Sequence, residues 1–198
     1  MADLGTILIG NTTTALNNGS IGTGGTTGST PYLEDISGTD DATSYIEETT
    51  NQTATNYDLY MALDNFPADL DNVDTLSIRV RYAHISPNAN LTWDQLSCRP
   101  YKSDLSTALA NELTIHNGHS TDTWTSSSVL PFVNVDTAAT KGEWDAAVIY
   151  FYWGKTRAKG GNTGADMAIT AAELTGTYTE SAGATPEIVP LMATRTAP

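Results

Sequence analysis

Residues 75–85, TLSIRVRYAHI, alternate between apolar and polar side chains along the whole segment. A period of two residues is typical of a β-strand that buries one face, and it differs from the period of about 3.6 residues of a helix. The pattern predicts an inward-facing row of Leu76, Ile78, Val80 and Tyr82. Residues 56–67 precede it with a similar row of Tyr57, Leu59, Met61 and Leu63, ending at Pro67. Two half-buried strands in succession favour a β-sheet protein.

Other segments extend the strand pattern. Residues 91–98, LTWDQLSC, read as a strand, and residues 165–181 form another, with a bulge expected near Ala171 and Ala172. The run AAVIYFYW, residues 146–153, is continuously apolar or aromatic, as in a strand that is buried on both faces. Residues 103–118 fit either one helical turn at 104–112 or a strand at 112–116.

Turn-forming residues separate these segments. Residues 68–74, ADLDNVD, and 136–145, DTAATKGEWD, both read as turns. About eight strands at spacings of roughly 8 to 15 residues indicate a sandwich or a barrel-like roll. We therefore predict an all-β protein, an antiparallel β-sandwich of jelly-roll type.

The composition suggests three regions along the chain. Residues 1–31 would form an N-terminal strand followed by an extended arm rich in glycine and threonine, because residues 10–31 are of low complexity and almost uncharged. Residues 32–181 would form the β-sandwich domain. Residues 182–198 contain three prolines and would form a C-terminal tail outside the sheets.

The charge of the chain argues against several classes of function. The formal net charge is −14, and residues 1–78 hold twelve acidic residues with no Lys or Arg. A nucleic-acid partner is not expected, because such proteins need a basic face against the phosphates. No apolar stretch approaches the roughly 20 residues that a membrane-spanning helix needs. The N-terminus lacks a basic secretory signal, so we expect a protein made in the cytoplasm, without a membrane partner.

Gly154-Lys155-Thr156 follows an apolar run, as the end of a phosphate-binding loop does. Such a loop needs a glycine five residues earlier and a helix afterwards. Ile149 occupies the earlier position, and residues 155–166 lack a helical period. No nucleotide or other cofactor is therefore expected. The segment is interpreted as a connection between strands, with a basic cluster of Lys155, Arg157 and Lys159.

Metal and catalytic motifs are weak. His116 and His119 lack a third zinc ligand at a recognised spacing. The acidic run with Asp69, Asp71 and Asp74 fails the spacing of an EF-hand loop, although an irregular calcium site there or at residues 40–41 stays an alternative. Cys98 lies in a strand pattern and is predicted to be a small buried hydrophobic residue. We predict no catalytic residues and no enzyme.

The layout of the chain resembles the β-sandwich structural proteins of tailed bacteriophages. The resemblance runs through DDATSYIEE (40–48), YDLYMALDNFPADLDNVDTLSIRVRYA (57–83) and GEWDAAVIYFYW (142–153), and it covers roughly residues 32–180. It implies a non-enzymatic virion protein, of the capsid-decoration, head-fibre or tail-associated kind. It also implies a location in the virion and partners such as the major capsid protein.

The arm and the basic cluster are the expected assembly interface. A polar arm becomes ordered only where a shared interface offsets the cost, so the anchors would be the apolar residues of this region together with the basic cluster: Ile7, Leu8, Ile9, Leu16, Ile21, Lys155, Arg157 and Lys159. Copies of the chain would form a closed symmetric assembly, with a trimer as one candidate.

A carbohydrate-binding module is the alternative function. Exposed aromatic side chains such as Trp93, Trp124 or Trp153 would then stack on host surface glycans. The strand context of each of these tryptophans favours packing in the core of the sandwich over such a role.

Overall fold

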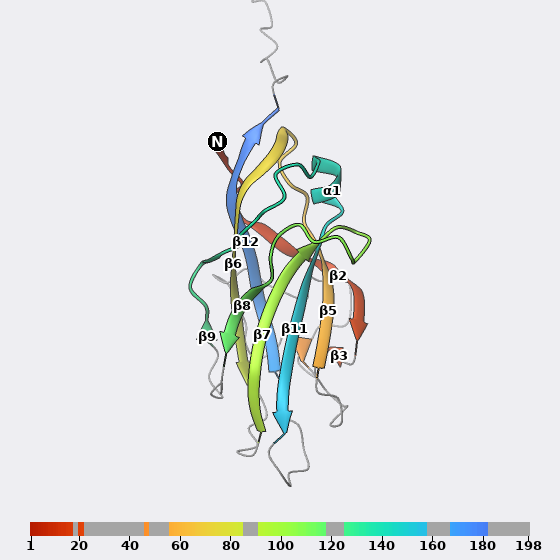
Figure 1. The fold of residues 1–198 in the computed structure, drawn as a ribbon, viewed down its shortest axis with the longest axis vertical. Coiled ribbons are helices and arrows are strands. Elements are labelled where there is room, and N and C mark those ends of the chain that lie inside the picture. Colours follow the sequence, from red (N-terminus) through yellow and green to blue (C-terminus); the bar gives the residue numbers. More distant parts are fainter. Residues whose placement is uncertain are drawn as a thin grey trace, which may run out of the picture.

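The computed structural model describes residues 1–17, 20–21, 46–47, 56–84, 91–117, 125–157 and 167–181. These residues contain twelve strands and one short helix, which form an elongated molecule (Figure 1). The elements are β1 (Ala2–Asp3), β2 (Ile7–Asn17), β3 (Ser20–Ile21), β4 (Ile46–Glu47), β5 (Asn56–Leu63), β6 (Leu70–His84), β7 (Leu91–Tyr101), β8 (Leu113–Asn117), β9 (Thr125–Ser126), β10 (Leu130–Pro131), α1 (Lys141–Asp145), β11 (Val148–Arg157) and β12 (Met167–Glu180).

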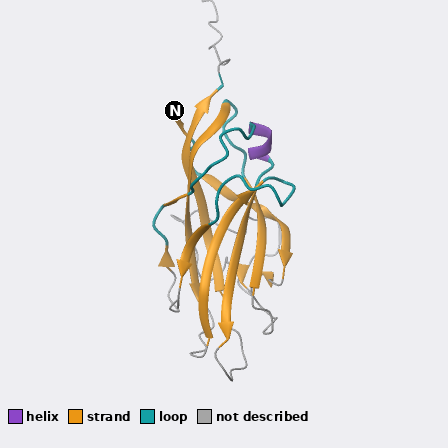
Figure 2. Ribbon diagram, in the orientation of Figure 1, coloured by secondary structure: helices purple, strands orange, loops and turns teal. Residues whose placement is uncertain are grey.

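The strands form two antiparallel sheets that share β2. In the first sheet the order is β10-β6-β12-β2, and in the second it is β2-β5-β11-β7-β8. Strand β2 pairs through Ile7 and Leu8 with β12, and from Ile9 to Asn17 with β5. The short strands β1 and β4 pair with β12, β3 pairs with β4, and β9 pairs with β6. The prediction of an all-β antiparallel protein is confirmed, as the dominance of strands in Figure 2 makes plain.

The order of pairing is nested along the chain. Counting β2, β5, β6, β7, β8, β10, β11 and β12 as eight strands, the first pairs with the eighth and the second with the seventh. The third pairs with the sixth and the fourth with the fifth. The three remaining pairs, β6 with β12, β11 with β7 and β2 with β5, complete the sheets.

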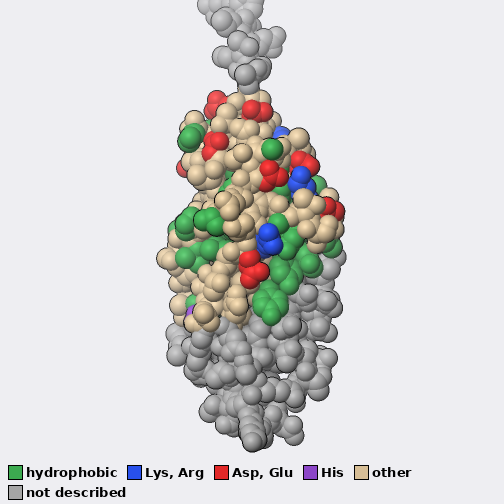
Figure 3. Space-filling model, viewed as in Figure 1, with side chains coloured by type: hydrophobic (Ala, Val, Ile, Leu, Met, Phe, Trp, Pro, Cys, Tyr) green, Lys and Arg blue, Asp and Glu red, His purple; other side chains and the backbone are tan. Residues whose placement is uncertain are grey.

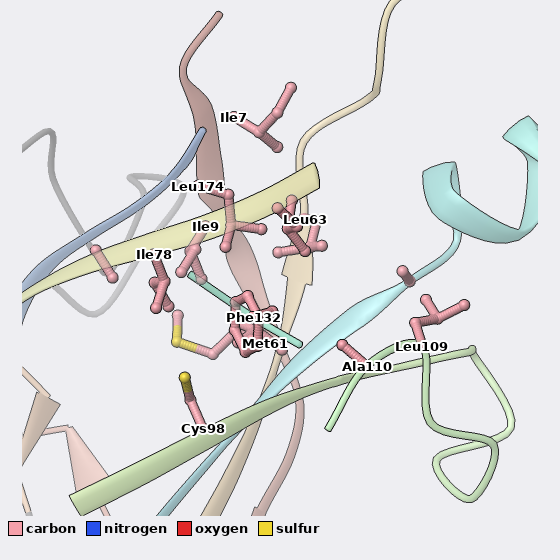
Figure 4. Packing of buried hydrophobic residues seen from close by; sticks show 14 of the residues in the cluster. Ile7, Ile9, Met61, Leu63, Ile78, Cys98, Leu109, Ala110, Phe132 and Leu174 are labelled. Atoms are coloured by element: carbon pink, nitrogen blue, oxygen red, sulfur yellow. The ribbon is translucent and has the colours of Figure 1, made fainter. Parts of the chain in front are cut away.

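The core lies between the two sheets. Ile78 and Leu174 reach it from β6 and β12, while Ile9, Met61 and Cys98 reach it from β2, β5 and β7 (Figure 4). Each of these side chains is fully buried. The predicted inward row of β6 is confirmed, since Leu76, Ile78, Val80 and Tyr82 are all buried.

The pairing of β6 with β12 requires a bulge and a glycine. The register shifts between Ile169 and Ala171, which confirms the bulge expected near the two alanines. Gly176 faces β6 so closely that an added Cβ would lie 2.1 Å from the backbone oxygen of Thr75. Only glycine fits this contact without displacing backbone.

A short helix precedes β11 in the chain. Residues 136–145 were predicted as a turn, but Lys141–Asp145 form α1. Thr140 caps the helix, because its hydroxyl accepts from the Glu143 N–H while the Glu143 carboxylate accepts from the Thr140 N–H. Trp144 is fully buried against Phe66, with ring centroids 5.3 Å apart. The spacing Thr-x-x-Glu is the signal that could have predicted this helix.

Part of the predicted arm belongs to the sheets. Strand β2 continues to Asn17, beyond the end predicted for the first strand. Ile7 and Ile9, expected as assembly anchors, are 5% and 0% exposed in the core of their own chain. Their burial corrects that expectation, because neither side chain is left for a neighbouring copy. Of the rest of the arm, Ser20–Ile21 form β3, whereas residues 18–19 and 22–31 and the tail 182–198 lie outside the described residues.

Two further predictions, for residues 68–74 and 146–153, are wrong in detail. The acidic run 68–74 is mostly strand, because β6 begins at Leu70 and buries Leu70 and Val73. The run 146–153 is not buried on both faces: Ile149 and Phe151 are buried, but Tyr150 and Tyr152 are partly exposed. The strand alternative for residues 112–116 is the correct one, since β8 spans Leu113–Asn117.

Candidate functional site

The outward side of the second sheet carries a cluster of tyrosines. Residues Met61, Ile149 and Cys98 point into the core, so their neighbours along each strand point outward. Tyr60, Tyr101, Tyr150 and Tyr152 occupy such outward positions on β5, β7 and β11 and are partly exposed. We call these four residues, together with Arg99, the tyrosine face.

The strand register brings these side chains together. Tyr150 of β11 lies directly opposite Tyr60 of β5 and Arg99 of β7. Directly opposite residues on one face of a sheet are close enough for their side chains to interact. Tyr152 follows two residues later on the same side of β11. The register therefore places Tyr60, Tyr150 and Arg99 in one outward row across three strands, with Tyr101 and Tyr152 in the rows on either side.

The rings contact one another in several orientations. The centroids of Tyr60 and Tyr150 are 4.8 Å apart, with their planes tilted by 40°. Tyr101 meets both rings edge-on, at 6.3 Å from Tyr60 and 5.9 Å from Tyr150. Tyr152 lies 6.4 Å from Tyr150, with an interplanar angle of 28°. Edge-to-face and offset pairs of this kind are the favourable arrangements for aromatic rings.

Arg99 is fixed at one side of the cluster. Its Nε donates a hydrogen bond of 2.8 Å to the carbonyl oxygen of Ala110. Its guanidinium carbon lies 5.4 Å from the centroid of the Tyr101 ring, which is within the range of a cation–π contact. These contacts hold both Arg99 and Tyr101 in place.

Polar groups continue the outward rows of β7. Gln95 Nε2 lies 3.4 Å from an oxygen of Glu112 and 3.4 Å from the hydroxyl of Thr114, which makes two long hydrogen bonds. Ser97 lies between Tyr152 and Thr114 in the register. Its hydroxyl is buried and has no hydrogen-bond partner among the residues that the structure describes.

Figure 3 shows this surface directly. The second sheet faces the viewer, and hydrophobic and tyrosine side chains gather over the region of β5, β7 and β11. Basic and acidic side chains also lie on this face, between the hydrophobic patches. The tyrosine face was not predicted from the sequence. Its signal was the alternation in residues 149–152, where Ile149 and Phe151 are interleaved with Tyr150 and Tyr152.

The basic cluster lies partly in a strand. Strand β11 extends to Arg157, and Lys155 and Arg157 pair there with Trp93 and Leu91 of β7. Gly154-Lys155-Thr156 is therefore strand, with a register shift between Gly154 and Lys155. A phosphate loop needs backbone N–H groups turned toward the ligand, so this pairing argues further against a nucleotide site.

Other predicted site residues are only partly described. Lys159, Trp124 and His119 lie outside the described residues. For Leu8, Leu16 and Ile21 the structure gives strand positions only, in β2 and β3. Trp93 and Trp153 likewise have strand positions in β7 and β11, and of the tryptophans only Trp144, which is in the core, has a described side chain.

The residues considered for metal binding do not converge in the described part of the chain. Asp69 accepts a hydrogen bond from the Tyr178 hydroxyl at 2.9 Å, and Asp74 accepts one from Thr179 at 3.0 Å. His116 Nδ1 lies 3.2 Å from the hydroxyl of Tyr82. Among the described residues, no group of three or more His, Cys, Asp or Glu could hold a metal ion.

Cys98 is a core residue, as predicted. Its side chain is fully buried, and this burial, together with the Glu112 carboxylate, raises the pKa of the thiol well above its ordinary value. A thiol with a raised pKa stays protonated at neutral pH and is a poor nucleophile. Cys98 therefore contributes packing to the core.

Comparisons with known proteins give no family for the chain. No protein-family model matches it, and a search of curated proteins finds no match. In the part of the chain that the structure describes, no helix has the length and apolar character needed to cross a membrane.

Proposed function

We propose that the chain is a non-enzymatic structural subunit of a bacteriophage virion, of the capsid-decoration or fibre type, built on a jelly roll. The observation that carries the proposal is the nested strand order, in which the first of eight strands pairs with the eighth and the fourth with the fifth. Jelly rolls place eight antiparallel strands in two packed sheets, and viral capsid domains are among the proteins that use them.

Self-association is the second part of the proposal. The partners would be copies of the same chain and other virion proteins, such as the major capsid protein. The basic residues Lys155, Arg157 and Lys159 would face an acidic region of a neighbour, since the chain as a whole carries a net charge of −14. Leu8, Leu16 and Ile21 remain candidate anchors of the arm.

Mass spectrometry of purified phage particles tests the proposal. Particles are purified by density gradient from a lysate of the host that carries the gene. The chain is expected at a constant ratio to the major capsid protein across gradient fractions. A chain that is expressed in the lysate but absent from the particles would contradict the virion role.

Charge reversal tests the proposed interface. The variant Lys155→Glu/Arg157→Glu/Lys159→Glu is expected to shift the assembly toward smaller species in light scattering coupled to size exclusion. Deletion of residues 1–30 would not test the role of the arm in assembly, because it would also remove Leu4, Ile7 and Ile9 from the core. An unchanged assembly with unchanged salt dependence would show that the basic cluster is not an interface.

A further inference from the structure

The tyrosine face is a partly exposed aromatic surface on the outward side of the second sheet. In an antiparallel sheet that packs on one side, the outward positions are ordinarily polar. Here Tyr60, Tyr101, Tyr150 and Tyr152 are half-buried against one another on the outward side, where they add nothing to the core between the sheets. A contiguous aromatic surface of this kind marks an interaction site.

The composition of the surface favours a particular kind of ligand. On β5 and β11, the outward positions with a described side chain are Tyr60, Tyr150 and Tyr152, together with the small Ala62 and the buried Val148. Asp58, opposite Tyr152, and Gly154 also have outward positions in the register. The described outward positions of β7 are polar or aromatic. The tyrosine face therefore consists of tyrosine rings and Arg99, with no Leu, Ile or Met side chain among its members. It offers aromatic faces and hydrogen-bonding groups in close alternation.

A saccharide offers the matching combination of groups. A pyranose ring with equatorial hydroxyls presents C–H groups on its two faces and hydroxyls around its rim. The C–H hydrogens carry a partial positive charge, and the face of an aromatic ring carries a partial negative one, so the two attract. The rim hydroxyls can meanwhile bond to polar groups beside the tyrosines, and Gln95 is suited to this because its two bonds are long, at 3.4 Å.

The charge of the protein selects among saccharides. The whole chain carries a net charge of −14, and Arg99 is the basic residue of the tyrosine face. Such a protein repels polyanionic sugars at a distance. The guanidinium of Arg99 is also occupied by the Ala110 carbonyl and the Tyr101 ring. These observations favour a neutral sugar.

We propose that the tyrosine face binds a neutral saccharide chain, with its pyranose rings stacked on Tyr60, Tyr150 and Tyr152. The rings are held in place by one another, at centroid distances of 4.8 Å and 6.4 Å, so little side-chain freedom is lost on binding. The proposal is independent of the virion role, because a saccharide could bind this surface on a free protein or on a particle.

Titration of the protein with two neutral sugars, cellotetraose and tetra-N-acetylchitotetraose, tests the proposal. Tyrosine ring resonances are followed by NMR at sugar concentrations up to about 10 mM, above the millimolar Kd expected for a few stacked rings. The wild-type protein is expected to show saturable shifts with at least one of the two sugars. Tyr152→Ala and Tyr60→Ala should each weaken binding about fivefold to tenfold, the scale of one lost aromatic contact.

Two variants serve as matched controls. Tyr152→Phe keeps the ring and should bind within about twofold of wild type if stacking is the main contribution. Val133→Ser removes an exposed apolar side chain, 58% exposed, that lies outside the tyrosine face, and should leave binding unchanged. Circular dichroism establishes that each variant is folded.

Three outcomes would overturn the proposal. In the first, neither sugar shifts the tyrosine resonances of the wild-type protein. The sugars could bind Tyr152→Ala and Tyr60→Ala as tightly as wild type, which would place the site elsewhere. Alternatively, the resonances could respond to protein concentration and to neither sugar, which would assign the tyrosine face to contact with a second copy of the chain.

Discussion

The outward sides of the two sheets differ sharply, although both sheets are antiparallel and enclose one core. On the first sheet, the outward positions of β6 and β12 face each other as Ser77 with Thr175, Thr75 with Thr177, and Arg79 with Glu173. On the second sheet, the corresponding positions hold tyrosines. The first surface is that of a sheet exposed to water. The second is aromatic. A polar outward surface is enough for the fold, as the first sheet shows, so the aromatic surface is better explained by a ligand or a partner.

The largest expected effect is on stability, and it differs between the inward and outward residues of β11. Phe151 is fully buried, whereas its neighbour Tyr152 is partly exposed on the tyrosine face. Phe151→Ala leaves a cavity in the core and should lower the free energy of unfolding by about 3–5 kcal/mol. Tyr152→Ala should lower it by no more than about 1 kcal/mol, since one ring contact is lost. Urea denaturation measures both, and equal losses would mean that the tyrosine face is part of the core.

A second prediction concerns the close contact within the first sheet. Gly176→Ala would place a Cβ 2.1 Å from the Thr75 backbone oxygen, so β6 and β12 must separate locally. We expect the free energy of unfolding to fall by about 2 kcal/mol, as for other overpacked sites. Gly142→Ala is the matched control: nothing lies within 4 Å of the added Cβ, and the residue is in α1. That variant should be more stable than wild type by up to about 1 kcal/mol, and a loss of stability in both would refute the steric explanation.

The comparison of the two sheets also shows which features of the fold could be predicted from the sequence. Strand periodicity was enough to place Leu76, Ile78, Val80 and Tyr82 inward, because burial on one face imposes a period of two. It was also enough to anticipate the bulge near Ala171, where the period shifts. These features depend on residues close together in the chain.

The tyrosine face could not be predicted in the same way. Its members come from residues 60, 99–101 and 150–152, and they meet only because β11 pairs with both β5 and β7. That pairing joins strands far apart in sequence, and nothing local in the sequence specifies it. The apolar run 146–153 was misread for the same reason, since tyrosine fits both a core and an aromatic surface.

Two serines give a third, smaller prediction. The Ser127 hydroxyl, beside the first sheet, accepts from the Val80 N–H at 3.0 Å and donates to the Ser128 carbonyl at 2.8 Å. Ser127→Ala should therefore cost about 1 kcal/mol of stability. Ser97, under the tyrosine face, has a buried hydroxyl without a partner among the described residues. Ser97→Ala should be neutral or stabilising by up to about 1 kcal/mol. Thermal unfolding should show a lower melting temperature for Ser127→Ala and an unchanged or higher one for Ser97→Ala. A destabilised Ser97→Ala would reveal that its hydroxyl has a partner.

The smallest effect concerns the loop that follows Tyr101 at the edge of the tyrosine face. Lys102 Nζ lies 2.8 Å from a Glu143 carboxylate oxygen, and Asp104 accepts from the N–H groups of Ser106 and Thr107. Leu105, between Asp104 and Ser106, has a φ of 59°, which is an unfavourable left-handed conformation for a leucine. These contacts therefore hold a strained turn. The hydrogen bond from Lys102 lowers the pKa of Glu143, and the Thr107 hydroxyl and N–H lower that of Asp104.

The sign of the pH dependence follows from these lowered pKa values. A carboxyl group whose pKa is lower in the folded state stabilises the fold above its unfolded pKa, and this stabilisation is lost as the pH falls through the folded pKa. Glu143→Gln should therefore lower the melting temperature slightly at pH 7, and the difference from wild type should shrink as the pH drops below about 4. Because Glu143 is exposed, the shift should be the smallest of the four. If the ring resonances of Tyr101 also move in Glu143→Gln, the loop helps to position the tyrosine face. If they do not move, strand pairing alone positions that surface. The contrast between the two sheets is then a property of their strand registers.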